Sequence, residues 1–225
     1  RGVGMHALSL TQPMVYWADD ELGLQLAAAV NDAISAAHLA HPDRFIGFAH
    51  LPFQNARLAL EELERAARLP GIRGVYMATA VRDRELSDRS FFPIYARMEE
   101  LGLPLFLHPM MINNERLKQW YLINTLGNPF DVAIAASHLI RDECKHLPRP
   151  PSEYLKRFTY DTISYCPEVM DYLVRLVGSD RIMMGSDYCF DIAHNDPVGV
   201  VHEMSLDDNQ REQVLWSNAA RLLRL

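Results

Sequence analysis

The chain has 225 residues, of which 49% are hydrophobic and 23% charged, and its formal net charge is -7. This length and apolar content suffice for one sizeable hydrophobic core. Acidic and basic residues are mixed along the chain, which argues against a nucleic-acid surface, and no apolar run approaches the ~20 residues that span a membrane.

The three cysteines, Cys144, Cys166 and Cys189, show no C-x-x-C spacing. An odd number without that spacing is typical neither of a disulfide framework nor of a thiolate zinc site. Free cysteines are typical of a reducing compartment, so we expect a cytoplasmic protein.

Six times along the chain, a short apolar run precedes a longer amphipathic segment. The apolar runs, predicted as strands, cover residues 3–10, 45–52, 72–81, 103–109, 157–164 and 181–188. The amphipathic segments, predicted as helices, cover residues 21–40, 55–69, 91–102, 115–126 with 128–140, 167–178 and 206–225. This alternation predicts parallel strands joined by helical crossovers.

Several helix ends carry recognisable signals. The first helix should end where His41 precedes a proline, because the residue before proline disfavours the α conformation. Asn55 is expected to cap the second helix, and Gly102 to end the third. Asn128 is expected to cap a helix that carries Pro129 at its first position.

Two architectures fit this alternation: a doubly wound open sheet and a (β/α)8 barrel. No glycine-rich G-x-G-x-x-G or P-loop motif follows any strand, so the usual nucleotide signature of the open sheet is missing. A (β/α)8 barrel needs eight strand–helix units, whereas the sequence predicts six. Between Ile140 and Phe158 the sequence predicts no strand, only a polar, proline-rich loop with one helical turn at residues 152–157.

Active sites of parallel α/β proteins form at the carboxyl ends of the strands. The polar residues expected there are Ser9, Thr11, His50, Gln54, Thr79, His108, Asp161, Ser164, Ser186 and Asp187. His108 and Asp187 directly follow the apolar runs "LPLFLH" and "RIMMGSD". Imidazole and carboxylate groups meeting at one rim would supply two ligands for zinc or another divalent ion.

Structural roles compete with this interpretation. A strand-end histidine such as His108 or His50 is more often a hydrogen-bonded structural residue, and Asp187 after a glycine can serve a turn. His194 and His202 follow the last strand closely enough to border a site, although exposure is the simpler expectation. Trp120 fits either a core position or the wall of a pocket above His108.

Several stretches together resemble one branch of the amidohydrolase superfamily. They are "LPLFLHP", "ERLKQW", "PRPPSEYLKRF", "GSDYCFD" and the terminal "SNAARLL". The branch contains 2-amino-3-carboxymuconate-6-semialdehyde decarboxylase, γ-resorcylate decarboxylase, 5-carboxyvanillate decarboxylase and a related hydratase. The resemblance covers essentially the whole chain, with Cys189 where the family usually has proline.

This resemblance implies a distorted (β/α)8 barrel that holds one divalent metal, usually zinc. By position, His108 is similar to the metal-binding histidine after the fifth strand, and Asp187 to the metal-binding aspartate after the eighth. Trp120 is similar to a tryptophan near the family's substrate pocket. The resemblance also implies a homodimer or higher homo-oligomer.

The sequence departs from the family in two places. The family's first strand ends in His-x-His and its sixth in A-H-x-G-G, and neither motif occurs here. We therefore expect residues 1–225 to form a single barrel domain that is incomplete before Arg1 and between Ile140 and Arg141. Losing a central barrel strand would expose unpaired sheet edges, which is costly.

The resulting hypothesis is a metal-dependent carboxy-lyase for a small aromatic or muconate-type carboxylic acid. Asp187 would ligate the metal and also move a proton, because loss of the carboxylate requires protonation of the carbon. The alternatives are a metal-dependent hydrolase or hydratase on the same barrel, and a degenerate barrel that only binds ligands. We expect neither nucleic acid nor a membrane as a partner.

Overall fold

The computed structural model describes the chain except residues 1, 111, 113 and 144–147, so Cys144 lies outside the described residues. The chain forms two compact units, one of Gly4–His146 and one of Leu147–Leu225 with Arg1–Val3. Among the described residues, no helix combines the length and apolar character needed to cross a bilayer.

A four-stranded parallel sheet forms the centre of the unit Gly4–His146. Its strand order is β1 (His6–Leu8), β2 (Phe45–His50), β3 (Ile72–Ala78) and β6 (Leu105–His108). All three pairings are parallel, with His50 opposite Tyr76 and Ala78 opposite His108. The carboxyl ends of β2, β3 and β6 therefore meet at one edge, as the sequence predicts.

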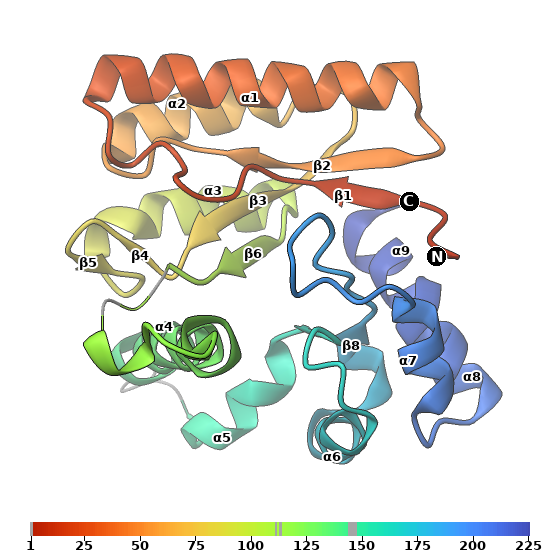
Figure 1. Cartoon of the computed structure of the whole chain (residues 1–225). Helices are drawn as coiled ribbons and strands as arrows, with labels where there is room; N and C mark the ends of the chain where they lie inside the picture. The colour runs from red at the N-terminus through yellow and green to blue at the C-terminus, as the bar shows by residue number, and fades with distance from the viewer. Residues whose placement is uncertain (1, 111, 113, 144–147) are drawn as a thin grey trace. The chain divides into compact units, whose positions relative to one another are not determined.

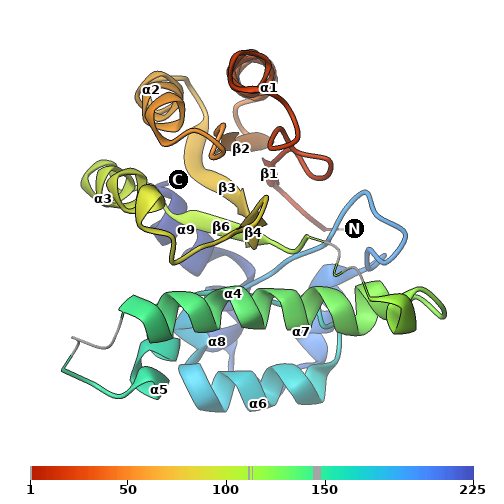
Figure 2. The same ribbon diagram turned by 90° about the vertical axis from the view of Figure 1, so that its left-hand side faces the viewer.

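Three helices connect these strands and lie along one face of the sheet (Figures 1 and 2). They are α1 (Asp20–Ala40), α2 (Ala56–Ala66) and α3 (Phe92–Leu101), the last preceded by the 3-10 turn η1 (Arg89–Phe91). Gly47 lets α1 approach β2, because an added Cβ would lie 1.9 Å from Ile34 Cγ2. On the opposite face, the Phe106 ring stacks on Phe48 and Tyr76, with centroids 5.4 and 5.5 Å away.

Three of the predicted helix ends are confirmed. The backbone of His41 closes α1 through a hydrogen bond to the Ala37 carbonyl. The Asn55 side chain accepts hydrogen bonds from the first turn of α2 at 3.1 and 3.2 Å. Gly102 ends α3 with a φ of 63°, a left-handed conformation that favours glycine.

The helix predicted over residues 115–126 is wrong. That segment instead forms the 3-10 turn η2 (Glu115–Leu117) and the π-helical turn η3 (Ile123–Gly127). Trp120 and Tyr121 between them have φ values of 60° and 57°, which a right-handed helix does not allow. The prediction of Asn128 as a cap also fails, because Asn128 is already helical and η3 runs directly into α4 (Asn128–Glu143).

A short antiparallel hairpin follows β3. The run predicted as one strand over residues 72–81 divides at Thr79 into β3 and β4 (Ala80–Val81). Strand β4 pairs with β5 (Arg84–Glu85). Arg84 fixes the hairpin, because its guanidinium donates hydrogen bonds to the carbonyls of Phe53 and Gln54 at 3.0 Å.

The second unit contains the remaining two predicted strands. Strands β7 (Tyr160–Asp161) and β8 (Ile182–Met183) form a parallel pair. The helical segments are α5 (Pro151–Tyr154), η5 (Leu155–Arg157), α6 (Pro167–Val177), η6 (Ser179–Arg181), α7 (Pro197–Glu203), α8 (Asp208–Glu212), η7 (Gln213–Ser217) and α9 (Asn218–Leu223). The single turn predicted at residues 152–157 is confirmed by α5 and η5.

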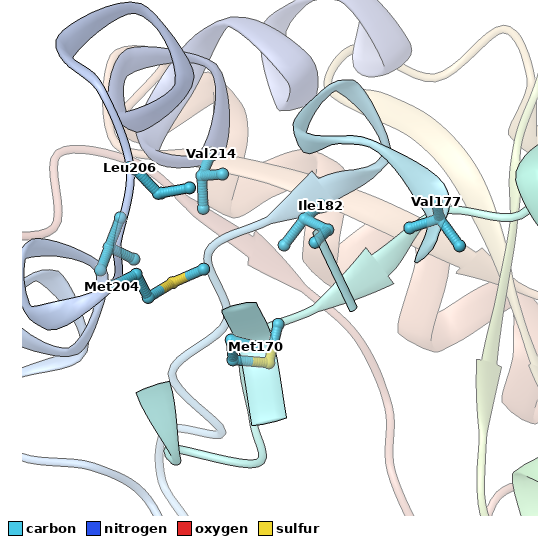
Figure 3. Close-up of a cluster of buried hydrophobic side chains, with 7 residues drawn as sticks. Met170, Val177, Ile182, Met204, Leu206 and Val214 are labelled. Carbon is cyan, nitrogen blue, oxygen red and sulfur yellow. The ribbon is translucent and has the colours of Figure 1, made fainter. Parts of the chain in front are cut away.

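An apolar cluster joins β8 to the helices of this unit (Figure 3). Its buried members are Met170, Val177, Ile182, Val201, Met204, Leu206 and Val214. The amide of Asn218 adds a polar tie, because it donates hydrogen bonds to the carbonyls of Ile182 and Ser179 at 2.8 and 2.7 Å. The cluster therefore holds the short strand that precedes Asp187.

Shortening Ile182 to valine should lower the free energy of unfolding by about 1 kcal/mol, because a buried methyl group is lost. Ile182 is fully buried in the cluster. Urea denaturation followed by circular dichroism measures the change. The control is Val169→Ala on α6, where the side chain is 53% exposed and the expected change is below about 0.5 kcal/mol. Equal losses in both variants would contradict the assigned core.

Candidate metal centre

Several of the selected polar residues lie at or after strand ends within their own units. His50 and His108 are the last residues of β2 and β6, and Thr79 directly follows β3. In the other unit, Asp161 ends β7 and Asp187 lies in the loop after β8. His108 and Asp187 thus belong to different units.

His108 is half-buried, and both its ring and its backbone are held. Its ring packs against Tyr76 with the centroids 5.4 Å apart and the planes tilted by 35°. Its carbonyl accepts a hydrogen bond from the Thr79 amide at 3.0 Å. The imidazole therefore projects from a defined position at the carboxyl edge of the sheet, as a ligand must.

A second anchor follows His108 in the chain. The Met110 amide donates to the Thr79 hydroxyl at 3.0 Å and to the Asp131 carboxylate at 2.7 Å. The Thr79 hydroxyl in turn donates to the same Asp131 oxygen. Sequence reasoning missed Asp131, although an acidic residue in the first turn of a helix was an available signal.

His50 is fully buried, and its ring lies near Tyr76, the residue that also contacts His108. Its ring stacks on Tyr16 at 5.6 Å, and within the described part of the chain neither ring nitrogen has a hydrogen-bond partner. The expected hydrogen-bonded structural histidine is therefore not what the structure shows. Burial lowers the pKa of His50 to about 4, so the imidazole is neutral near pH 7.

The backbone of His50 is fixed by a buried polar network. The Asn31 side chain accepts from the His50 amide at 2.7 Å and donates to the His50 carbonyl at 2.9 Å. The same amide group donates to the buried Glu62 carboxylate at 2.6 Å, and Arg65 donates to Glu62 at 2.8 Å. These contacts tie α1 and α2 to the carboxyl end of β2.

Asp187 has a left-handed backbone conformation in the unit Leu147–Leu225. Its φ is 50°, a conformation that glycine, asparagine and aspartate populate more often than other residues. Its carbonyl accepts from the Phe190 amide at 3.0 Å, which closes the turn. Aspartate therefore suits the backbone of this turn.

The ends of β7 and β8 bring further polar groups toward Asp187. The Gly185 amide donates to the buried Thr162 hydroxyl at 3.1 Å. Asp161 is exposed, yet many protein atoms surround its carboxyl group. The resulting partial loss of hydration raises the pKa of Asp161, and the nearby negative charge of Asp187 raises it further. Burial, with smaller contributions from both carboxylates, raises the pKa of Tyr165 to about 12.

Of the remaining predicted residues, one is half-buried and two are exposed. His194 is half-buried, and its ring packs on Tyr165 at 5.2 Å. His202 is exposed, and Trp120 is 85% exposed. Among the described residues, no three histidine, cysteine, aspartate or glutamate side chains cluster in the manner of a complete metal site. The assignment of His108 and Asp187 as metal ligands therefore stays a prediction.

The described units are built from parallel strands joined by helices, with His108 at the end of β6 and Asp187 in the loop after β8. The family model described as Amidohydrolase matches residues 2–225, and the chain belongs to this family. The predicted family is thereby confirmed.

Named relatives of the chain are decarboxylases. It is 27% identical over 249 residues to 2-amino-3-carboxymuconate-6-semialdehyde decarboxylase of Dictyostelium discoideum, covering 93% of this chain and 69% of the relative. Among solved structures, 5-carboxyvanillate decarboxylase from Sphingomonas paucimobilis matches with a TM-score of 0.87 and 23% identity, over 100% of this chain and 80% of the other.

A second solved structure carries a metal. Dihydroxybenzoic acid decarboxylase from a Polaromonas species, with bound manganese and the inhibitor 2-nitroresorcinol, matches with a TM-score of 0.86 and 21% identity. The match covers 100% of this chain and 82% of the other. At these identities the two structures establish the fold, and the family they represent implies a TIM-type (β/α)8 barrel.

Proposed function

We propose that this protein is a metal-dependent carboxy-lyase of the amidohydrolase superfamily, acting on a small aromatic or muconate-type carboxylic acid. The observation that carries the proposal is the placement of His108 at the end of the parallel strand β6 and of Asp187 in the loop that follows the parallel strand β8. Membership of the amidohydrolase family and a relative named as a decarboxylase support the same reading.

His108 and Asp187 are the proposed ligands of one divalent cation. Their chemistry fits, because imidazole nitrogen and carboxylate oxygen are the ligands that zinc and similar cations accept in catalytic sites. A bound cation supplies Lewis-acid stabilisation of negative charge. The resemblance favours zinc, and the manganese in a structural neighbour supports a divalent cation in general. Elemental analysis of the purified full-length protein identifies it.

The chain's own residues have distinct proposed tasks. His108 would hold the cation through its ring at the edge of the four-stranded sheet. Asp187 would hold it through one carboxylate oxygen and, with its other oxygen, would pass a proton from solvent to the carbon that loses the carboxylate. Trp120 is proposed to line the substrate pocket. Its side chain is exposed and therefore accessible to a substrate. His194 is half-buried, packs on Tyr165 and belongs to the same unit as Asp187.

Product analysis tests the proposed reaction. Purified full-length protein is incubated with hydroxylated aromatic acids and with a carboxymuconate semialdehyde, and released CO2 is measured alongside incorporation of 18O from labelled water. CO2 release without 18O in the organic product supports a carboxy-lyase. Incorporation of 18O without CO2 release would instead identify a hydrolase or hydratase on the same fold.

We further propose that the protein is a single barrel whose first and sixth units lie outside these 225 residues. The alignment with the Dictyostelium relative is 249 residues long yet covers 93% of this 225-residue chain, so the relative has residues without a counterpart here. Because a barrel uses ~30 residues per unit, the intact mass of the protein from its natural source should exceed 25.7 kDa by several kilodaltons. A measured mass of 25.7 kDa would contradict this proposal.

The proposal includes a homodimer or higher homo-oligomer, which the family resemblance favours, and a cytoplasmic location, which the cysteine pattern favours. Light scattering coupled to gel filtration of the full-length protein tests the oligomer. A monomer at micromolar concentration would remove this part of the proposal without affecting the reaction.

A further inference from the structure

The backbone that follows the His108 ring is held by Thr79 and Asp131, which lie outside its own strand. The Thr79 backbone amide donates to the His108 carbonyl at 3.0 Å. Two residues on, the Met110 amide donates to the side-chain oxygens Thr79 Oγ1 and Asp131 Oδ2, at 3.0 and 2.7 Å. The two side chains also bond to each other, so they act as one clamp.

Burial and charge make this clamp more than a surface contact. Thr79 is 2% exposed, and its hydroxyl uses both its donor and its acceptor capacity within the clamp. Asp131 lies in the first turn of the 16-residue helix α4, where the helix dipole favours a negative charge. Hydrogen bonds to a charged carboxylate are stronger than neutral ones, so the Met110 amide has a preferred position.

The clamp connects three separate elements at the ligand's position. Thr79 follows β3, Asp131 belongs to α4, and both act on the segment that leaves β6 through His108. The Tyr76 ring, which contacts the His108 ring at 5.4 Å, limits the imidazole from the β3 side. Metal ligands depend on such surrounding contacts, because a displaced imidazole weakens the bond to the metal.

We propose that Thr79 and Asp131 are positioning residues that set the orientation of His108 for divalent-cation binding. Neither residue contacts the cation, and each acts through the backbone of residues 108–110. This inference rests on the proposed function, because it takes His108 as a ligand.

The test measures Mn²⁺ affinity of the full-length protein by chelator competition, together with thermal unfolding of each variant. Thr79→Val removes the hydroxyl at nearly constant shape, and Thr79→Ser restores it. Asp131→Ala removes the carboxylate of the clamp at a half-buried position. This variant provides the test if the Thr79→Val variant fails to fold. The matched control is Ser35→Ala, which deletes another buried hydroxyl, the donor to the Pro70 carbonyl at 2.9 Å.

Thr79→Val and Asp131→Ala should each weaken Mn²⁺ binding about 10–100-fold, the loss typical of removing a partner that orients a ligand. Thr79→Ser should regain most of the affinity, and Ser35→Ala should keep the parent affinity despite a comparable loss of thermal stability. This pattern would support positioning, since a merely structural role would move stability alone.

His108→Ala separates the possible failures. If it abolishes Mn²⁺ binding while Thr79→Val and Asp131→Ala retain the parent affinity, the clamp is structural and the inference is overturned, whereas the proposed function stands. If the His108→Ala variant keeps the parent's Mn²⁺ affinity, or if the parent binds no Mn²⁺, the assignment of His108 as a ligand fails. The inference then fails with it.

Discussion

Replacing Asp187 with asparagine is expected to remove tight divalent-cation binding and to lower the decarboxylation rate about 10³-fold. Lewis-acid stabilisation is worth several kcal/mol, and each 1.36 kcal/mol corresponds to a factor of ten in rate. Asparagine keeps the side-chain shape and tolerates the left-handed φ of 50° at this position, so the backbone should persist. Only the negative charge and its ability to carry a proton are lost.

The measurement pairs elemental analysis with a CO2-release assay on the full-length protein. Asp191→Asn is the matched control, because it makes the same chemical change at an exposed site in the same loop and should leave both quantities unchanged. Parent-like turnover of the Asp187→Asn variant would exclude Asp187 from the metal centre and from catalysis. A variant that binds the cation but turns over slowly would assign Asp187 to proton transfer alone.

Replacing Asn31 with leucine should lower the free energy of unfolding by about 3–5 kcal/mol. The substitution leaves the backbone groups of His50 without their side-chain partner and leaves the buried Glu62 carboxylate with one hydrogen bond fewer. Each buried polar group without a partner costs about 1–3 kcal/mol, and an uncompensated buried charge costs more. Asn31 is fully buried and Glu62 is 2% exposed, so water offers little replacement.

Chemical denaturation measures this loss, and the network itself supplies the control. Asp32→Asn removes the outer arm of the Arg65 bridge, where Arg65 Nη1 lies 2.6 Å from a carboxylate whose side chain is 58% exposed. Exposed ion pairs contribute about 0–1 kcal/mol, so this neighbouring substitution should have little effect. Similar losses in the two variants would mean that the buried part of the network is not what stabilises the end of β2.

Features set by neighbouring residues in sequence were predictable. All six apolar runs contain a parallel strand, because alternation of short apolar and longer amphipathic segments is a local pattern. Asn55 and Gly102 act as predicted, since capping depends on one side chain or one φ angle. The strand end that carries His108 followed from the same local pattern, whereas β8 ends at Met183 and leaves Asp187 in the following loop.

Features set by distant residues were not predictable. The segment around Trp120 and Tyr121 has helical spacing, yet both residues adopt positive φ, which periodicity does not reveal. Asp131 reaches the end of β6 from a helix that begins 20 residues later, and Asn31 reaches His50 from 19 residues earlier. The local pattern around each of these side chains is unremarkable, so their roles emerge only from the packed chain.

The exposure of Trp120 has a spectroscopic consequence. All three tryptophans of the chain, Trp17, Trp120 and Trp216, are between 48% and 85% exposed. Unfolding therefore changes their surroundings little, and their emission should already resemble that of indole in water. For the same reason the fluorescence background from buried tryptophan is low, so a ligand or subunit that covers Trp120 would shift the emission of the whole protein toward the blue.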